Sequence, residues 1–149
     1  MYAVKLGPNE QEKFKARYVA KGYSQIENID YRETFSPTAR ITSIRMLMQL
    51  AVQYNFIVHQ MDVKTAYLNA NIDCEIYVEQ PPGFVKKGEN GETLVYKLRK
   101  SLYGLKQSGR MWNNVIHEFL YNLCFTQSMS DHCVYYRHCL LYTSDAADE

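Results

Sequence analysis

The sequence predicts an α+β fold with a largely antiparallel sheet and packed helices. Three observations support this prediction. One stretch near the N-terminus alternates apolar and cationic residues with the period of a strand, and two later stretches place apolar residues with the period of a helix. The predicted strands and helices alternate without a strict βαβ repeat, which favours antiparallel over parallel pairing.

The first predicted strand covers residues 13–21, where Ala16 and Tyr18 share a face with other apolar residues and Lys15 and Arg17 share the opposite face. Residues 22–40 contain turn-forming groups such as Phe35-Ser36-Pro37, so a long ordered loop is expected there. A helix is expected from Thr42 or Ser43 as N-cap. Its apolar stripe should face a core, and consists of Ile44, Leu47, Met48, Ala51 and Val52.

Further along the chain, residues 57–63 form a short, mostly apolar run that predicts a buried strand ending at Asp62. Residues 75–78 predict another short strand, and Asn90-Gly91 predicts a hairpin turn before a strand over residues 94–98. A second helix is expected over residues 109–123, and a last strand near residues 133–137. The apolar stripe of that helix is Trp112, Val115, Ile116, Phe119, Leu120 and Leu123.

Composition is that of an ordinary soluble domain, with 149 residues, 17 Lys plus Arg and 16 Asp plus Glu. No apolar run approaches the roughly 20 residues of a membrane-spanning helix, and no N-terminal stretch fits a signal peptide. We therefore expect an intracellular protein, cytoplasmic by default, with no membrane partner.

The four cysteines should be reduced, buried thiols. Zinc is a weaker alternative, because Cys124, His132, Cys133, His138 and Cys139 match zinc-ligand spacings poorly.

An acid at the end of a buried strand can ligate a hard cation such as Mg²⁺, which takes one or two carboxylates plus phosphate oxygens. A buried Asp more often caps a turn or pairs with a cation, here Lys64, so Asp62 alone leaves both interpretations open. Tyr67 fits the wall of the same pocket, and it fits simple core packing equally well.

Two groups of cations suggest contacts with phosphate. Lys15 and Arg17 would lie about 7 Å apart on one strand face, which suits adjacent phosphates, although a solvated edge strand is the alternative that the spacing alone favours. The second group surrounds Tyr103-Gly104, and basic residues interleaved with aromatics suit phosphate contact and base stacking. A solvated connecting segment explains this group equally well. We call it the basic cluster, and it consists of Lys97, Arg99, Lys100, Lys106 and Arg110.

Four stretches, in this order, resemble the reverse transcriptase domain of copia-type retrotransposon polyproteins. They are KARYVAKGYSQ (residues 15–25), DYRETFSP (30–37), QMDVKTAYLN (60–69) and SLYGLKQ (101–107), followed by Trp112. The resemblance extends from about residue 4 to residue 137. It implies a right-hand polymerase fold, of which this chain would supply the fingers and part of the palm.

The resemblance also implies an activity, RNA-directed DNA polymerisation, and residues for it. Lys15 and Arg17 would bind the nucleotide triphosphate from a fingers strand, and Tyr67 would lie beneath the sugar and exclude a 2′-hydroxyl. Asp62 would be the catalytic carboxylate that binds metal, with the backbone carbonyl of Val63 as a further ligand. The family mechanism uses two Mg²⁺ ions, with Mn²⁺ as the alternative, to clamp the attacking and leaving oxygens.

The second palm motif would begin at Tyr103, with Gly104 allowing close approach and with Lys106 and Gln107 also near the template or nucleotide. Many relatives have Ala-Pro or Ser-Pro where this chain has Ser108-Gly109, a departure expected to loosen the start of the helix. The implied partners are a primed RNA or DNA template and deoxynucleoside triphosphates. The remainder of the polyprotein, with the rest of the palm, the thumb, RNase H and integrase, is a further implied partner.

The family's Tyr-x-Asp-Asp hairpin has no counterpart, because the sequence contains no Asp-Asp pair. Residues 139–149, CLLYTSDAADE, instead match a translated sequencing-library adapter, so we expect residues 1–138 to be a partial domain and 139–149 a non-native tail. Without the tail the acidic count falls by three, and the formal net charge rises from +1 to +4. This truncated fragment is expected to be inactive alone. The alternative is a non-catalytic nucleic-acid-binding remnant of a transposable element.

Overall fold

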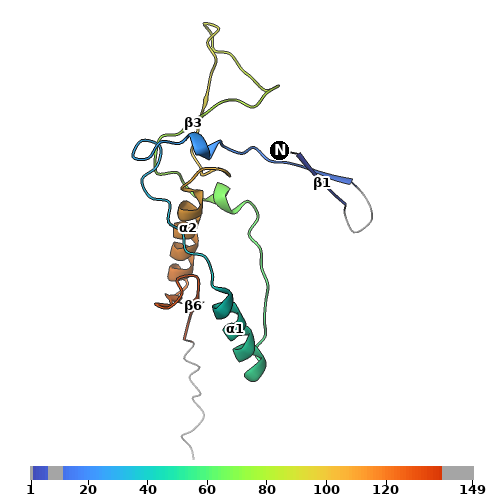
Figure 1. Cartoon of the computed structure of the whole chain (residues 1–149), viewed down its shortest axis with the longest axis vertical. Helices are drawn as coiled ribbons and strands as arrows, with labels where there is room; N and C mark the ends of the chain where they lie inside the picture. Colours follow the sequence, from blue (N-terminus) through green and yellow to red (C-terminus); the bar gives the residue numbers. More distant parts are fainter. Residues whose placement is uncertain (1, 7–11, 139–149) are drawn as a thin grey trace, which may run out of the picture. The chain divides into compact units, whose positions relative to one another are not determined.

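A computed structural model describes residues 2–6 and 12–138 of the chain. The described residues combine two α-helices with short antiparallel strands (Figure 1), which is compatible with the predicted α+β class. In chain order the elements are β1 (Tyr2–Leu6), β2 (Glu12–Ala16), η1 (Gly22–Ser24), α1 (Ile41–Gln53), η2 (Ala66–Asn69), β3 (Tyr77–Val78), β4 (Tyr96–Lys97), α2 (Ser108–Asn122), β5 (Thr126–Gln127) and β6 (Tyr135–Tyr136).

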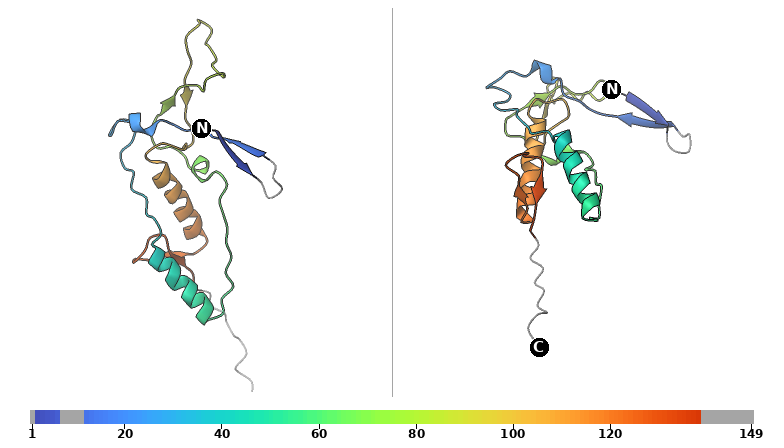
Figure 2. Two further views of the ribbon diagram at one scale, coloured as in Figure 1. Left: turned by 45° about the vertical axis from the view of Figure 1, so that its right-hand side comes forward. Right: turned by 60° about the horizontal axis from the view of Figure 1, so that its bottom comes forward.

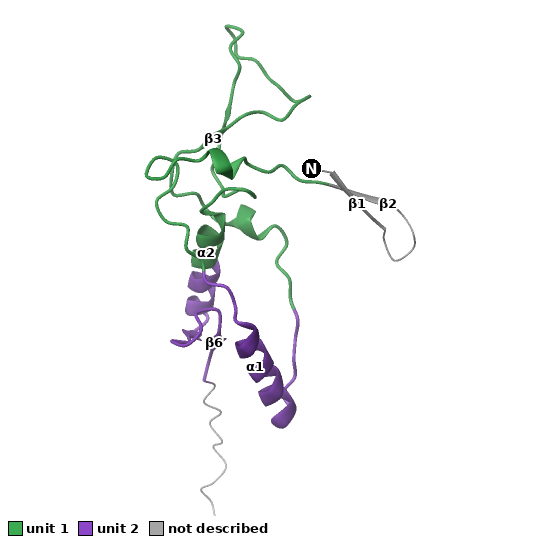
Figure 3. Ribbon diagram, in the orientation of Figure 1, with its two compact units in different colours: residues 1–36, 61–115 green, residues 37–60, 116–149 purple. Residues whose placement is uncertain are grey.

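The chain divides into two compact units, coloured separately in Figure 3. Unit 1 comprises residues 1–36 and 61–115, and unit 2 comprises residues 37–60 and 116–149. Helix α2 begins in unit 1 and continues into unit 2. All the residues proposed from the sequence as functional belong to unit 1.

Strand pairing produces three separate two-stranded sheets in the described chain, where the sequence predicted one sheet (Figure 2). In the first, β1 and β2 are antiparallel, with Tyr2 opposite Ala16. The strand predicted over residues 13–21 was wrong beyond Ala16, because the pairing with β1 ends there and residues 17–21 have no ladder partner among the residues that the structure describes. A strand is stabilised by its cross-strand neighbours, so the alternating pattern alone does not extend it.

The strands predicted over residues 75–78 and 94–98 are confirmed in shortened form as β3 and β4, with Tyr77 opposite Lys97. The predicted hairpin turn at Asn90-Gly91 is also confirmed. Lys87 and Thr93 form an antiparallel bridge, and Gly91, at φ 83°, donates its N–H to the carbonyl of Gly88 at 3.1 Å. The last predicted strand is present as β6, which pairs with β5.

Helix α1 confirms the predicted helix but not its predicted burial. The helix begins after Arg40, so Thr42 and Ser43 lie within its first turn and neither is the N-cap. No residue of α1 is buried, and the side chains of Leu47, Met48 and Val52 are exposed. The expectation that this stripe faces a core was wrong, because periodicity identifies an apolar face but not a segment to cover it.

The predicted buried strand over residues 57–63 was also wrong. This segment has no ladder partner among the residues described, and the side chains of Ile57 and Met61 are 84% and 90% exposed. Asp62 therefore lies in an exposed, unpaired segment. The long loop predicted over residues 22–40 is confirmed, and it contains η1 and a single bridge between Glu27 and Tyr31.

Several buried residues of unit 1 lie in the segment that leads into α2 and in the first turn of that helix. Leu105 and Met111 are buried there with three polar residues, namely Ser101, Gln107 and Ser108. Helix α2 agrees with the helix predicted over residues 109–123.

The expectation of buried thiols was wrong for the described cysteines. Cys74 and Cys133 are half-buried, Cys124 is exposed, and all three are free thiols. Cys139 and the predicted non-native tail, residues 139–149, lie outside the described residues.

Among the helices that the structure describes, none has the length and apolar character needed to cross a membrane.

Candidate functional site

The centre of the candidate site is the turn formed by residues 101–107, which we call the 101–107 turn. Its Gly104 adopts φ +93°, and the Tyr103 carbonyl accepts the N–H of Ala20 at 2.8 Å. A Cβ built on Gly104 would lie 2.2 Å from the Ala20 carbonyl oxygen, and one on Gly22 would lie 1.9 Å from the Gly104 oxygen. Glycines at these two positions therefore let two backbone segments of the chain touch.

Gln107 is fully buried, and its side-chain amide is engaged within the chain. Its Nε2 donates to the backbone carbonyl of Asp30 at 2.9 Å, and its Oε1 accepts Nε2 of Gln25 at 3.1 Å. The Oε1 of Gln25 in turn accepts the backbone N–H of Lys106 at 2.8 Å. We call these three hydrogen bonds the amide relay. Sequence reasoning did not identify Gln25, since no local pattern signals a contact between residues 82 positions apart.

Lys106, predicted to be near template or nucleotide, contacts the same loop through its side chain. Its ammonium donates to the Gln25 carbonyl at 3.3 Å and to the Tyr31 hydroxyl at 3.2 Å. The ammonium also lies 4.7 Å from the centre of the Tyr31 ring, in a cation–π contact. Lys106 therefore links the 101–107 turn to residues 25–31.

The structure brings together two tyrosines that the sequence proposed. The rings of Tyr67 and Tyr103 meet edge to face, with centroids 5.0 Å apart and an interplanar angle of 61°. Tyr67 lies on η2, and the end of η2 is attached to the turn because the N–H of Ser101 donates to the Ala70 carbonyl at 2.9 Å. Both tyrosines are half-buried, so the pair makes a partly accessible aromatic wall beside Gly104.

The remaining predicted site residues are not gathered at the turn. Asp62 and Val63 lie in the exposed segment before η2. Arg17 is exposed and follows the end of β2. Lys15 belongs to β2, and its side chain lies outside the description.

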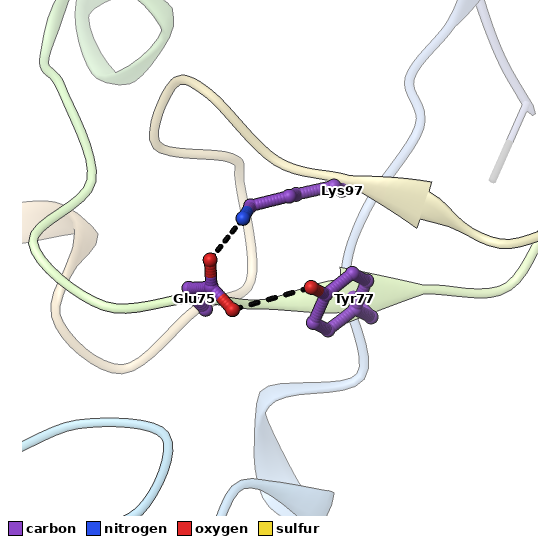
Figure 4. A network of polar contacts seen from close by, with 3 residues as sticks. All are labelled: Glu75, Tyr77 and Lys97. Carbon is purple, nitrogen blue, oxygen red and sulfur yellow. Dashed lines mark hydrogen bonds and ion pairs between the residues drawn. The ribbon is translucent and has the colours of Figure 1, made fainter.

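Much of the basic cluster is paired with acids or carbonyls of the chain itself. Lys97 forms an ion pair with Glu75, which also accepts the Tyr77 hydroxyl at 3.2 Å (Figure 4). The hydrogen bond from Lys97 lowers the pKa of the Glu75 carboxyl, and the same bond raises the pKa of Lys97. Arg110 forms an ion pair with Glu33. Sequence reasoning missed both acids, although Glu75 lies diagonally across the β3–β4 pair from Lys97.

The described side chains do not complete a metal site. No group of three His, Cys, Asp or Glu side chains is placed to hold an ion within residues 2–6 and 12–138. This includes the described members of the weak zinc alternative. Asp62 is the one acid that the resemblance assigns to metal, and a single exposed carboxylate does not hold two ions.

Comparisons with known proteins agree with the motif resemblance. A sequence model of the family described as "Reverse transcriptase (RNA-dependent DNA polymerase)" matches residues 1–142. The chain is 44% identical over 125 residues to the "Retrovirus-related Pol polyprotein from transposon TNT 1-94" of Nicotiana tabacum, covering 84% of this chain and 9% of that polyprotein.

It is also 44% identical over 119 residues to the "Retrovirus-related Pol polyprotein from transposon RE1" of Arabidopsis thaliana, covering 80% of this chain and 8% of that relative. The chain thus spans less than a tenth of these curated relatives. No solved structure matches it. With a family match over nearly its whole length, the chain belongs to the reverse transcriptase (RNA-dependent DNA polymerase) family.

Proposed function

We propose that this chain is part of a copia-type RNA-directed DNA polymerase domain, with a right-hand fold to which it contributes the fingers and the first part of the palm. The family match over residues 1–142 carries this proposal, and the Pol polyproteins at 44% identity support it. Residues 1–138 are proposed as the partial domain and residues 139–149 as a non-native addition. The complete domain would act on a primed RNA or DNA template and deoxynucleoside triphosphates.

The nucleotide side of the proposed site is the aromatic wall of Tyr67 and Tyr103. The edge-to-face contact of these rings beside Gly104 supports a surface against which a sugar and base pack. In this proposal Tyr67 excludes a 2′-hydroxyl by its bulk, and Lys15 and Arg17 bind the triphosphate. Lys106 and Gln107 lie near the ligand but contact residues 25–31 of the chain, so they shape the 101–107 turn.

The metal chemistry of the family is not complete in the described residues. Asp62 is proposed as the catalytic carboxylate and Val63 as a carbonyl ligand, but the sequence has no Asp-Asp pair and the described acids form no metal-binding group. Two Mg²⁺ ions need more carboxylate ligands than Asp62 provides. We therefore propose that the chain alone does not extend a primer, and that its activity requires the remainder of a Pol polyprotein.

A chimera tests this proposal. Replacing the matched 119 residues of the RE1 polyprotein by the corresponding residues of this chain should give Mg²⁺-dependent primer extension, measured with the unmodified RE1 protein as positive control. Asp62→Ala in the chimera should reduce extension to background. Extension that survives Asp62→Ala would contradict the role of that carboxylate, and extension by the isolated 149-residue chain would contradict its proposed incompleteness.

A second function, non-catalytic nucleic-acid binding, is favoured by the formal charge of +4 that remains once the three tail acids are excluded. Phosphate contacts make such binding weaken steeply with salt. If the isolated chain binds a primer–template duplex in a salt-dependent manner while the chimera stays inactive, the result supports non-catalytic nucleic-acid binding. An active chimera favours the polymerase domain.

A further inference from the structure

We propose that Gln25 is a positioning residue for the 101–107 turn. Through the amide relay, the Gln25 side chain fixes the orientation of the Gln107 amide and the backbone at Lys106. This inference rests on the proposed function, because only that function places the turn beside a nucleotide or template. No step of catalysis is assigned to Gln25 itself.

The two ends of the relay determine the direction of every hydrogen bond in it. The Asp30 carbonyl can only accept, so the group of Gln107 that faces it at 2.9 Å must be the donating Nε2. The Oε1 of Gln107 therefore faces Gln25, which must present its Nε2. The Oε1 of Gln25 is then left to accept the Lys106 N–H, which can only donate. Each amide has one orientation that satisfies all its partners.

Burial makes this orientation matter. Gln107 has no exposed surface, so losing the Gln25 donor would leave its carbonyl oxygen without a partner inside the protein. A buried polar atom without a partner is costly, whereas an exposed one is satisfied by water. Gln107 would then reorient or open toward solvent, and the Lys106 backbone would lose its fixed acceptor.

The same loop also holds the turn at two other points. The Lys106 ammonium lies over the Tyr31 ring. The Tyr103 carbonyl accepts the N–H of Ala20, close to where the Gly22 and Gly104 backbones meet. Residues 20–31 therefore contact both the backbone and the side chains of the 101–107 turn. Gln25 is the member of this contact that reaches both Lys106 and Gln107, which is why it is proposed as the positioning residue.

Two substitutions separate the relay from simple packing. Gln25→Met keeps the length of the side chain and removes both hydrogen bonds. Gln25→Glu keeps the acceptor for the Lys106 N–H but, when ionised, cannot donate to Gln107. When the introduced carboxyl is protonated, near its ordinary pKa of about 4.3, it regains an O–H donor. The matched controls are Gln53→Met and Gln53→Glu, because Gln53 is exposed on α1.

The first measurement is hydrogen exchange by NMR on the 149-residue chain, each variant compared with the unsubstituted protein at the same pH. Gln25→Glu at pH 7 should speed exchange of the Gln107 side-chain amide by about tenfold, the equivalent of one hydrogen bond, while the Lys106 N–H stays protected. Acidification should bring the Gln107 exchange rate of Gln25→Glu back toward that of the unsubstituted protein at the same pH. Gln25→Met should speed exchange at both sites at every pH. Unchanged Gln107 exchange in both variants, or a Gln25→Glu effect that acid does not reverse, would overturn the proposal.

The second measurement is the affinity of the same proteins for a DNA primer annealed to an RNA template, followed by fluorescence anisotropy. Gln25→Met should weaken binding about threefold to tenfold, and Gln53→Met should leave it unchanged. Equal affinities for these two variants would contradict a positioning role at the ligand site. Primer extension by the RE1 chimera tests the proposed function separately. If the unsubstituted chain does not bind the duplex, the exchange measurement still decides whether Gln25 orients Gln107.

Discussion

Gly104 allows a close contact between two backbone segments of unit 1. Its φ of +93° is a conformation that residues with a side chain rarely adopt, and its neighbour across the contact is the Ala20 carbonyl. Both the conformation and the lack of space therefore require glycine. The sequence resemblance placed a glycine here for approach to a ligand, and in the structure the approaching group is the protein's own backbone.

Gly104→Ala should destabilise unit 1 by about 2–4 kcal/mol, because the strained dihedral costs about 1–3 kcal/mol and the clash adds to it. Urea unfolding followed by the fluorescence of Trp112, the single tryptophan, measures the change. Gly83→Ala is the control, since Gly83 has φ +85° but nothing within 4 Å of the added Cβ. It should cost about 1 kcal/mol. Equal losses in the two variants would mean that the contact with Ala20 does not matter.

Groups at the start of helix α1 donate hydrogen bonds to a residue distant in sequence. The Asp131 carboxylate accepts the N–H of Arg40 at 3.1 Å and the Ser43 hydroxyl at 2.7 Å, and it also accepts the N–H of Cys133 at 2.9 Å. These bonds, led by that from Ser43, lower the pKa of Asp131. The carboxylate thus binds the start of α1 from a distant segment, whereas the sequence suggested a local N-cap at Thr42 or Ser43.

A carboxylate whose pKa is lowered by folding stabilises the folded state above its unfolded pKa, and this contribution is lost as the pH falls through the folded value. Asp131→Asn should therefore unfold at lower urea concentration than the unsubstituted protein at pH 7, as followed by helical circular dichroism. The difference should shrink once the pH falls below about 3.9, the ordinary Asp pKa. A difference that persists unchanged to pH 2, or one equally large for the exposed Asp73→Asn, would contradict this role of Asp131.

The elements that the sequence predicted well are those defined by neighbouring residues. Helix α2 and the Asn90-Gly91 turn follow from local periodicity and turn chemistry, and both are present. The strand over residues 57–63 and the burial of α1 depend on partner segments, which local patterns do not specify. The same reason explains why the resemblance assigned a place to Gln107 but no role to Gln25, which ends the first matched stretch, and why nothing in the sequence indicated Asp131.

At the scale of the whole molecule, the described chain leaves much apolar surface uncovered. The stripe of α1 is exposed, and so are the side chains of Phe56, Ile57, Val58 and Met61 that follow it. Clustered apolar surface is uncommon on monomeric soluble proteins and promotes association.

The isolated chain is therefore expected to self-associate through the apolar stripe of α1 and residues 56–61. Sedimentation velocity over a roughly tenfold range of concentration should show association that salt does not abolish, because apolar contacts are not screened as charges are. The double substitution Val52→Thr and Ile57→Thr should reduce association without lowering stability, since both side chains are more than four-fifths exposed. Val85→Thr, at an exposed apolar residue in the segment between β3 and β4, is the control and should leave association unchanged. A concentration-independent monomer would contradict the expectation, and equal effects of the double variant and the control would place the association surface elsewhere.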